Sequence, residues 1–151
     1  MDENRIILLK EIDLIQSILS RLSQNSFLVK GWAISVVVGI LALSSEKAGA
    51  NLACWFAIIS TCCFWFLDAF FLKTERLYRW KYNWVIQNRL HTQDFSYDLN
   101  PHNSKMWIPE VNSKSQKEPV ILRMMLTKSL LPIYLPLILF LILILILNSI
   151  K

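Results

Sequence analysis

The chain has 151 residues, of which 54% are hydrophobic and 18% are charged, and its formal net charge is +5. The apolar residues are gathered in long runs, which excludes an ordinary soluble domain and predicts an all-α integral membrane protein. The positive charge suits anionic headgroups as well as nucleic acid, and we expect membrane lipids rather than nucleic acid as partners.

Residues 1–24 mix charged and apolar positions, which predicts a cytoplasmic amphipathic helix and not a signal peptide. Glu11 and Gln16 are among the polar residues assigned to its outward side. Asn25 and Ser26 are then expected to cap the helix that follows. Heptad spacing predicts an oligomer or docking seam made of Leu8, Ile12, Ile15, Leu19 and Leu22.

Three segments are long and apolar enough to cross about 30 Å of hydrocarbon. They are residues 27–45, 52–72 and 130–147. The joint between the first two is short, so these two spans should form an antiparallel hairpin. Lys and Arg gather before the first span and after the second, which predicts a cytoplasmic N-terminus and middle segment and a C-terminus outside.

The first two spans each carry one charged side chain, Lys30 and Asp68. A carboxylate at the centre of a span costs about 2.5 to 3.5 kcal/mol, and less near its edge. In an antiparallel hairpin the two residues lie at matching depth. We expect an ion pair that locks the hairpin or joins subunits, and the alternative is a charged ring in an ion path.

Small residues recur every four positions on the first span, at Gly31, Ser35 and Gly39. Such a stripe lets helix backbones approach closely in lipid. The second span offers Ala57 and Thr61 in return. These residues serve packing within one chain alone, or the first two spans also carry the contacts between subunits, and the sequence does not separate these alternatives.

The second span is expected to continue as a cytoplasmic helix over residues 73–91, because that stretch contains no Gly or Pro. Its alternating bases and aromatics suggest contact with headgroups. A cytoplasmic loop and a short amphipathic helix should fill residues 92–128 before the third span. The bases predict a cytoplasmic basic patch made of Lys73, Arg76, Arg79 and Lys81.

No motif of a catalytic site is present, so we do not expect an enzyme. The chain has no HExxH, no GxSxG and no glycine-rich phosphate loop. The three cysteines lie inside one apolar run without the spacing of zinc ligands. We therefore predict no catalytic residue, no metal and no cofactor.

Two stretches carry a resemblance to known proteins. NSFLVKGW, residues 25–32, and FWFLDAFFLKTERLYR, residues 64–79, resemble a group of small, poorly characterised bacterial inner-membrane proteins. These share an N-S-F-L-x-K-G-W entry to a first span and a W-x-L-D with a downstream E-R-x-Y-R at the exit of a second. More loosely, the layout is similar to membrane accessory proteins of RNA-targeting CRISPR systems, which assemble into pores. Their divergent HEPN-like motif has no counterpart in this sequence.

Together these features predict a homo-oligomeric effector of the bacterial inner membrane. It would alter membrane permeability in antiviral defence when a cytoplasmic protein triggers it. The main alternative is a membrane anchor or scaffold that recruits a cytoplasmic partner and forms no pore.

Overall fold

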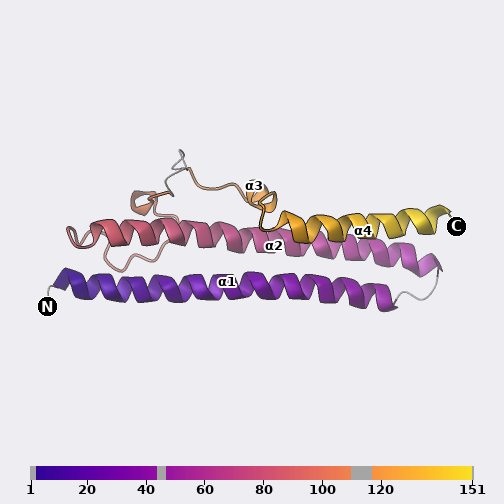
Figure 1. Cartoon of the computed structure of the whole chain (residues 1–151), viewed down its shortest axis with the longest axis horizontal. Coiled ribbons are helices and arrows are strands. Elements are labelled where there is room, and N and C mark those ends of the chain that lie inside the picture. The colour runs from indigo at the N-terminus through magenta and orange to yellow at the C-terminus, as the bar shows by residue number, and fades with distance from the viewer. Residues whose placement is uncertain (1–2, 44–46, 110–116, 151) are drawn as a thin grey trace. The chain divides into compact units, whose positions relative to one another are not determined.

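The computed structural model describes residues 3–43, 47–109 and 117–150. Within these ranges the chain forms helices and loops and no strand, which confirms the all-α class (Figure 1). The elements are α1 (Glu3–Leu43), α2 (Lys47–Asn88), η1 (Ser104–Met106), α3 (Ile121–Met125) and α4 (Leu131–Ile150). By length and composition, α1, α2 and α4 could each cross a membrane.

Helix α1 is continuous over 41 residues, so the helix start predicted at Asn25 and Ser26 is wrong. A cap would need the Ser26 hydroxyl to accept a hydrogen bond from the backbone. The hydroxyl instead donates to a carboxylate of α2, at Asp68. Because nothing in this stretch breaks the backbone pattern, the N-terminal segment and the first predicted span share one helix.

Helix α2 is also continuous, over 42 residues from Lys47 to Asn88. It begins before the predicted start of the second span at residue 52. It ends in a turn at residues 89–91, so the extension predicted beyond residue 72 is helical almost to its expected end. The predicted joint between the first two spans lies partly at residues 44–46, outside the described residues.

The chain divides into two compact units. Unit 1 comprises Met1–Gln24 and Phe71–Pro119, and unit 2 comprises Asn25–Phe70 and Val120–Lys151. Helices α1 and α2 therefore each contribute one stretch to each unit.

The core of unit 1 forms between the start of α1, the end of α2 and the segment after it. Ile15, Val85 and Met106 make one buried cluster, and Leu77, Trp80 and Trp107 make another. The Ile108 N–H donates to the Trp80 carbonyl at 3.3 Å, and the two tryptophan rings meet edge to face at 5.8 Å. The segment predicted as a loop thus packs firmly on α2.

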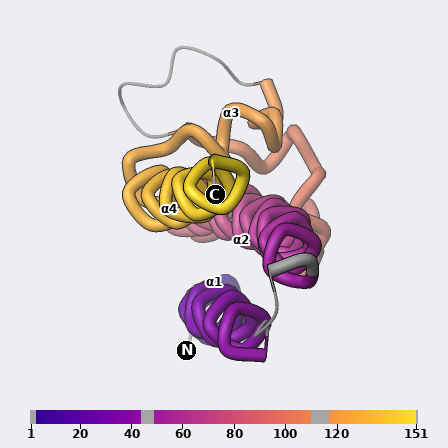
Figure 2. The backbone as a smooth tube through the Cα atoms, turned by 90° about the vertical axis from the view of Figure 1, so that its right-hand side faces the viewer, coloured from indigo at the N-terminus to yellow at the C-terminus, as the bar shows by residue number. Residues whose placement is uncertain are grey.

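In unit 2, one buried cluster is formed by Val37 of α1, Ala57 of α2 and Leu141 of α4. Figure 2 shows these three helices from their ends. A second contact joins Trp65 of α2 to Tyr134 of α4, whose rings stack at 5.8 Å. The Trp65 indole also donates to the carbonyl of Met125, at the end of α3, at 3.0 Å. Most other side chains of α4 face outward, as suits a helix surrounded by lipid.

Candidate functional site

The candidate site in unit 2 is centred on the carboxylate of Asp68, which is fully buried. Lys30 Nζ lies 2.8 Å from Oδ2 and 3.1 Å from Oδ1. The Ser26 hydroxyl donates to Oδ1 at 2.5 Å, and the Tyr134 hydroxyl donates to Oδ2 at 3.1 Å. The structure thus brings Lys30 and Asp68 together and adds two donors that the sequence had not revealed.

These contacts come from three helices, and each donor is positioned by its neighbours. Ser26 and Lys30 are four residues apart, so they share one face of α1, and Lys30 also donates to the Ser26 hydroxyl at 2.6 Å. Tyr134 is held by its stack on Trp65. A buried carboxylate is tolerated only when its oxygens are hydrogen-bonded and its charge is balanced, and here both conditions are met inside one chain.

The small-residue stripe of α1 does not face α2. Gly31, Ser35 and Gly39 are exposed, and a Cβ atom at either glycine would meet nothing within 4 Å. The buried side of this part of α1 is instead formed by Val29, Ala33 and Val37. The described part of the chain therefore does not pack against the stripe, which contradicts the interpretation that the stripe serves packing within the chain alone.

The orientation of α1 explains this outcome. Successive residues of an α-helix are rotated by roughly 100°, so Gly39 lies about half a turn from Lys30. Because Lys30 faces Asp68, the stripe faces away from it. On α2, Ala57 and Thr61 are buried without the stripe as their partner, and the Thr61 hydroxyl donates to the Ala57 carbonyl at 2.7 Å.

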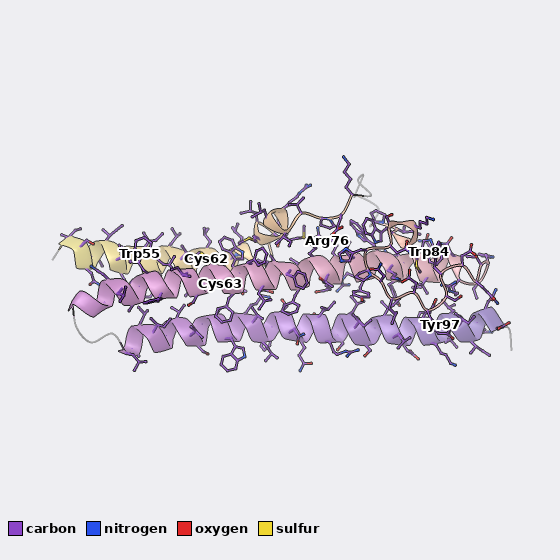
Figure 3. The ribbon with its side chains drawn as sticks, turned by 180° about the vertical axis from the view of Figure 1, so that it is seen from behind. Trp55, Cys62, Cys63, Arg76, Trp84 and Tyr97 are labelled. Carbon is purple, nitrogen blue, oxygen red and sulfur yellow. The ribbon has the colours of Figure 1, made fainter. Side chains whose placement is uncertain are left out.

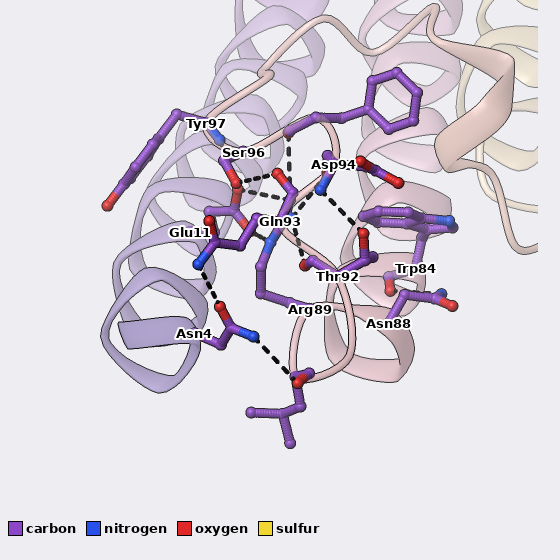
Figure 4. A network of polar contacts seen from close by, with 12 residues as sticks. Asn4, Glu11, Trp84, Asn88, Arg89, Thr92, Gln93, Asp94, Ser96 and Tyr97 are labelled. Carbon is purple, nitrogen blue, oxygen red and sulfur yellow. Dashed lines mark hydrogen bonds and ion pairs between the residues drawn. The ribbon is translucent and has the colours of Figure 1, made fainter. Parts of the chain in front are cut away.

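Unit 1 contains a second buried ion pair, which was not predicted, between Arg89 and Glu11 (Figure 4). Arg89 Nε and Nη2 donate to the two carboxylate oxygens at 2.6 and 2.9 Å. The remaining N–H groups donate to the backbone carbonyls of Thr92 at 3.1 Å, Asp94 at 2.8 Å and Phe95 at 3.2 Å. All five guanidinium donors are therefore used.

The pair also fixes a loop with an uncommon backbone. Phe95 and Tyr97 have positive φ angles of 56° and 58°, a conformation that non-glycine residues rarely adopt. Glu11 accepts a hydrogen bond from the Tyr97 N–H at 2.7 Å, and Arg89 holds the Phe95 carbonyl. The Trp84 ring lies 5.4 Å from the guanidinium. The ion pair thus orders the loop that follows α2.

Few features of the sequence indicate this ion pair. Glu11 lies among residues assigned to the outward face of the first helix, and that assignment is wrong, because Glu11 is buried. Arg89 is one of several bases that follow the second predicted span, and nothing in the sequence sets it apart from them. A carboxylate within an apolar helix face and an arginine at a helix end are the only features that could have suggested it.

The predicted basic patch is not a continuous free surface. Lys81 is only 1% exposed, so its placement there was wrong, and it donates to the Asn100 carbonyl at 2.9 Å. Burial lowers the pKa of Lys81, although the nearby charge of Asp98 opposes this shift. Lys73 pairs with Glu118 and Arg79 pairs with Glu75. Arg76 is half-buried and makes no ion pair with the described residues.

The same region is also less available to lipid than predicted, because Trp80 and Lys81 belong to the interior of unit 1. The predicted seam is likewise used inside the chain. Ile15 is buried, Leu8 and Leu19 pack against its cluster, and Ile12 and Leu22 are half-buried.

The described residues contain no group of histidine, cysteine, aspartate and glutamate side chains that could hold a metal ion. Cys54 is buried, whereas Cys62 and Cys63 are exposed on α2 (Figure 3). No protein-family model matches the chain, and comparisons with curated proteins and with solved structures find no significant match.

Proposed function

We propose that this chain is a homo-oligomeric protein of the bacterial inner membrane whose assembly alters membrane permeability. In this proposal α1, α2 and α4 are the spans, the N-terminus and unit 1 are cytoplasmic, and the C-terminus is outside. The antiviral, CRISPR-type setting and a cytoplasmic protein trigger follow only from the sequence resemblance described above.

The observation that carries the proposal is the outward stripe of Gly31, Ser35 and Gly39. In lipid, helices associate where small residues let their backbones approach. Among the described residues, nothing lies within 4 Å of a Cβ atom built at either glycine. A second copy is the partner that a homo-oligomer would place there.

Any path for ions would have to run between subunits. Asp68 is enclosed by donors of its own chain, so it is not free to line a channel. This favours the structural role of the Lys30–Asp68 pair over the charged-ring interpretation.

The enclosure of Asp68 also supports a second candidate, a membrane anchor or scaffold without a pore. The three predicted spans contain no charged residue besides Lys30 and Asp68. With both paired, no charged side chain in the described spans remains to attract ions. An anchor would need only the spans and a cytoplasmic surface for its partner.

Two measurements on the full chain separate these candidates. Gly39→Leu should lower the subunit number measured by mass in mild detergent, because a large side chain prevents close approach of the helices. Cys63→Leu is the matched control, since it also enlarges a small exposed residue of a span. If Gly39→Leu assembles like the parent chain, the stripe is not the subunit contact.

Permeability is then measured as ion flux from vesicles that contain the purified protein. A pore predicts flux in the parent chain that is lost with Gly39→Leu and kept with Cys63→Leu. An oligomer that gives no flux, with or without its cytoplasmic trigger, supports the anchor. Orientation is checked in a cysteine-free background. A thiol at Ser149 should react with an impermeant reagent from outside, and one at Ser104 should not.

A further inference from the structure

The segment between Val120 and Leu131 presents an unusual outward surface. Leu122 and Leu126 are 69% and 67% exposed, and Val120 is 62% exposed. Arg123 and Lys128, on the same segment, are exposed as well. Large apolar side chains beside two bases are typical of a helix that lies in the headgroup region of a membrane.

This surface is held in place by its inner side. Met124 and Leu130 are buried, and the Trp65 indole donates to the Met125 carbonyl. The Thr127 hydroxyl donates to the Met124 carbonyl at 2.7 Å and ends α3, and the Leu131 N–H donates to the Thr127 carbonyl at 3.0 Å as α4 begins. The outward side chains are therefore displayed by an ordered turn that continues into α4.

The position of the turn indicates what covers it. It lies directly before a helix long and apolar enough to cross a membrane, and it contacts Trp65, an aromatic residue of the type enriched at membrane interfaces. A second copy is a poor occupant, because a two-fold contact centred on this short segment would crowd the exposed bases of both copies into one interface.

We propose that the segment Val120–Lys128 is a binding surface for anionic phospholipid headgroups of the cytoplasmic leaflet. Leu122 and Leu126 enter the boundary between headgroups and acyl chains, and Arg123 and Lys128 contact the lipid phosphates with their extended side chains. This inference rests on the membrane setting of the proposed function, but not on oligomerisation or permeability.

The test uses the full cysteine-free chain with bimane attached to Leu122→Cys, in vesicles of phosphatidylglycerol and phosphatidylcholine. Nitroxides on lipid headgroups and on acyl chains quench at different depths, and iodide quenches from water. The label at position 122 should be quenched best by nitroxides near the boundary, about 5 to 10 Å below the surface. Labels at Leu143→Cys and Ser104→Cys serve as the acyl-chain and aqueous controls.

Headgroup preference is measured with nitroxide-labelled phosphatidylglycerol against nitroxide-labelled phosphatidylcholine. Arg123→Gln with Lys128→Gln should lower the preference for phosphatidylglycerol at position 122, by about five-fold for each base. Arg5→Gln with Lys10→Gln, two exposed bases of α1, should leave it unchanged.

Quenching of position 122 by iodide alone would overturn the inference, and so would protection from both iodide and lipid nitroxides, which would mean that protein covers the surface. An equal preference for the two lipids would remove the anionic specificity. In each of these cases the label at position 143 still reports lipid. If position 143 is not quenched by lipid nitroxides, the membrane setting itself fails, and the proposed function fails with it.

Discussion

Lys30–Asp68 in unit 2 and Glu11–Arg89 in unit 1 are both buried ion pairs that join α1 to the α2 side of the chain. In unit 2 the base belongs to α1 and the acid to α2. In unit 1 the acid belongs to α1 and the base directly follows α2. The described partners of Asp68 are all side chains, whereas Arg89 and Glu11 also bind four backbone groups. One pair therefore fastens helices together, and the other shapes a loop.

The two pairs also differ in how far water can reach them. The Lys30 side chain is 19% exposed, and its ammonium group lies at the end of a flexible chain. Arg89 is fully buried, and its five N–H groups all donate hydrogen bonds. A base that reaches water can be hydrated when its partner is lost, whereas a buried guanidinium or carboxylate is left without compensation for its charge. The loss of one partner should therefore be worse in unit 1, even though that unit is proposed to lie in the cytoplasm.

The largest expected effect follows from this difference. Arg89→Met leaves the Glu11 carboxylate buried without a counter-charge and frees three carbonyls of the loop. Breaking such a pair costs about 3 to 5 kcal/mol in the free energy of unfolding. Hydrogen exchange should show lost protection across residues 92–97 and at the start of α1.

Two further variants show whether burial causes the loss. Arg79→Met removes a pair within α2 whose arginine is exposed to solvent, and should cost about 0.3 to 0.5 kcal/mol. Arg89→Lys keeps the charge but lacks the planar fork, and should restore only part of the protection. Equal losses for Arg79→Met and Arg89→Met would contradict the comparison.

The second prediction concerns the pair in unit 2. Asp68→Asn and Lys30→Met should each destabilise the chain, and the double variant should be milder than the sum by about 0.5 to 3 kcal/mol. The measurement is unfolding in detergent followed by circular dichroism. The exchanged pair, Lys30→Asp with Asp68→Lys, should recover part of the loss. Additive single effects without recovery would mean that the two residues do not act together.

Tyr134→Phe should have a smaller effect, because it removes one of three donors and keeps the ring that stacks on Trp65. The expected cost is about 1 kcal/mol in the same assay. Tyr134→Leu, which removes the stack as well, should cost more. If Tyr134→Phe costs as much as Asp68→Asn, the carboxylate depends on the tyrosine and not on the lysine.

The smallest expected effect is a loss of stability of unit 1 at low pH. Burial raises the pKa of Asp98, but hydrogen bonds from Asn103 and the Asn100 N–H, together with the Lys81 charge, outweigh it, so its pKa is lowered overall. The hydrogen bond from Lys73 lowers the pKa of Glu118. Both carboxyl groups therefore stabilise the folded unit when the pH is above their ordinary pKa values. This stabilisation is lost as the pH falls below those values.

Hydrogen exchange of residues 98–103 as a function of pH checks this prediction. Protection should fall as the pH drops below about 4, where carboxyl groups of ordinary pKa become protonated. Asp98→Asn should make the profile flatter, and Glu118→Gln should change it less at this loop. A profile that Asp98→Asn leaves unchanged would exclude Asp98 as the source.

Depth and charge were enough to predict that Lys30 and Asp68 meet, because only one base and one acid lie in the first two spans. Two predictions for α1 also conflict with each other, and the rotation of about 100° per residue shows this conflict. Lys30 and the stripe of Gly31, Ser35 and Gly39 lie on different sides of α1, so both could not face α2. Counting rotations along the helix decides which side turns outward once the ion pair is accepted.

Other features depend on contacts between residues far apart in the chain. Glu11 and Arg89 are 78 positions apart, and Asp68 and Tyr134 are 66 apart. Lys81 was misplaced because a base beside aromatics resembles an exposed headgroup contact until a loop is seen to cover it. The helices follow from long apolar runs and, over residues 73–91, from the absence of Gly and Pro, whereas buried polar partners require the tertiary structure.

The distance in sequence between Asp68 and Tyr134 has a consequence for biosynthesis. A ribosome makes α1 first and α2 next, so Ser26 and Lys30 already exist when Asp68 is added. Tyr134 is made last of the four. For a chain that enters the membrane as proposed, the newly inserted hairpin holds a carboxylate that lacks one of its three donors. Arrival of α4 completes the set, so a product released before that helix would carry an unfinished polar site in its spans.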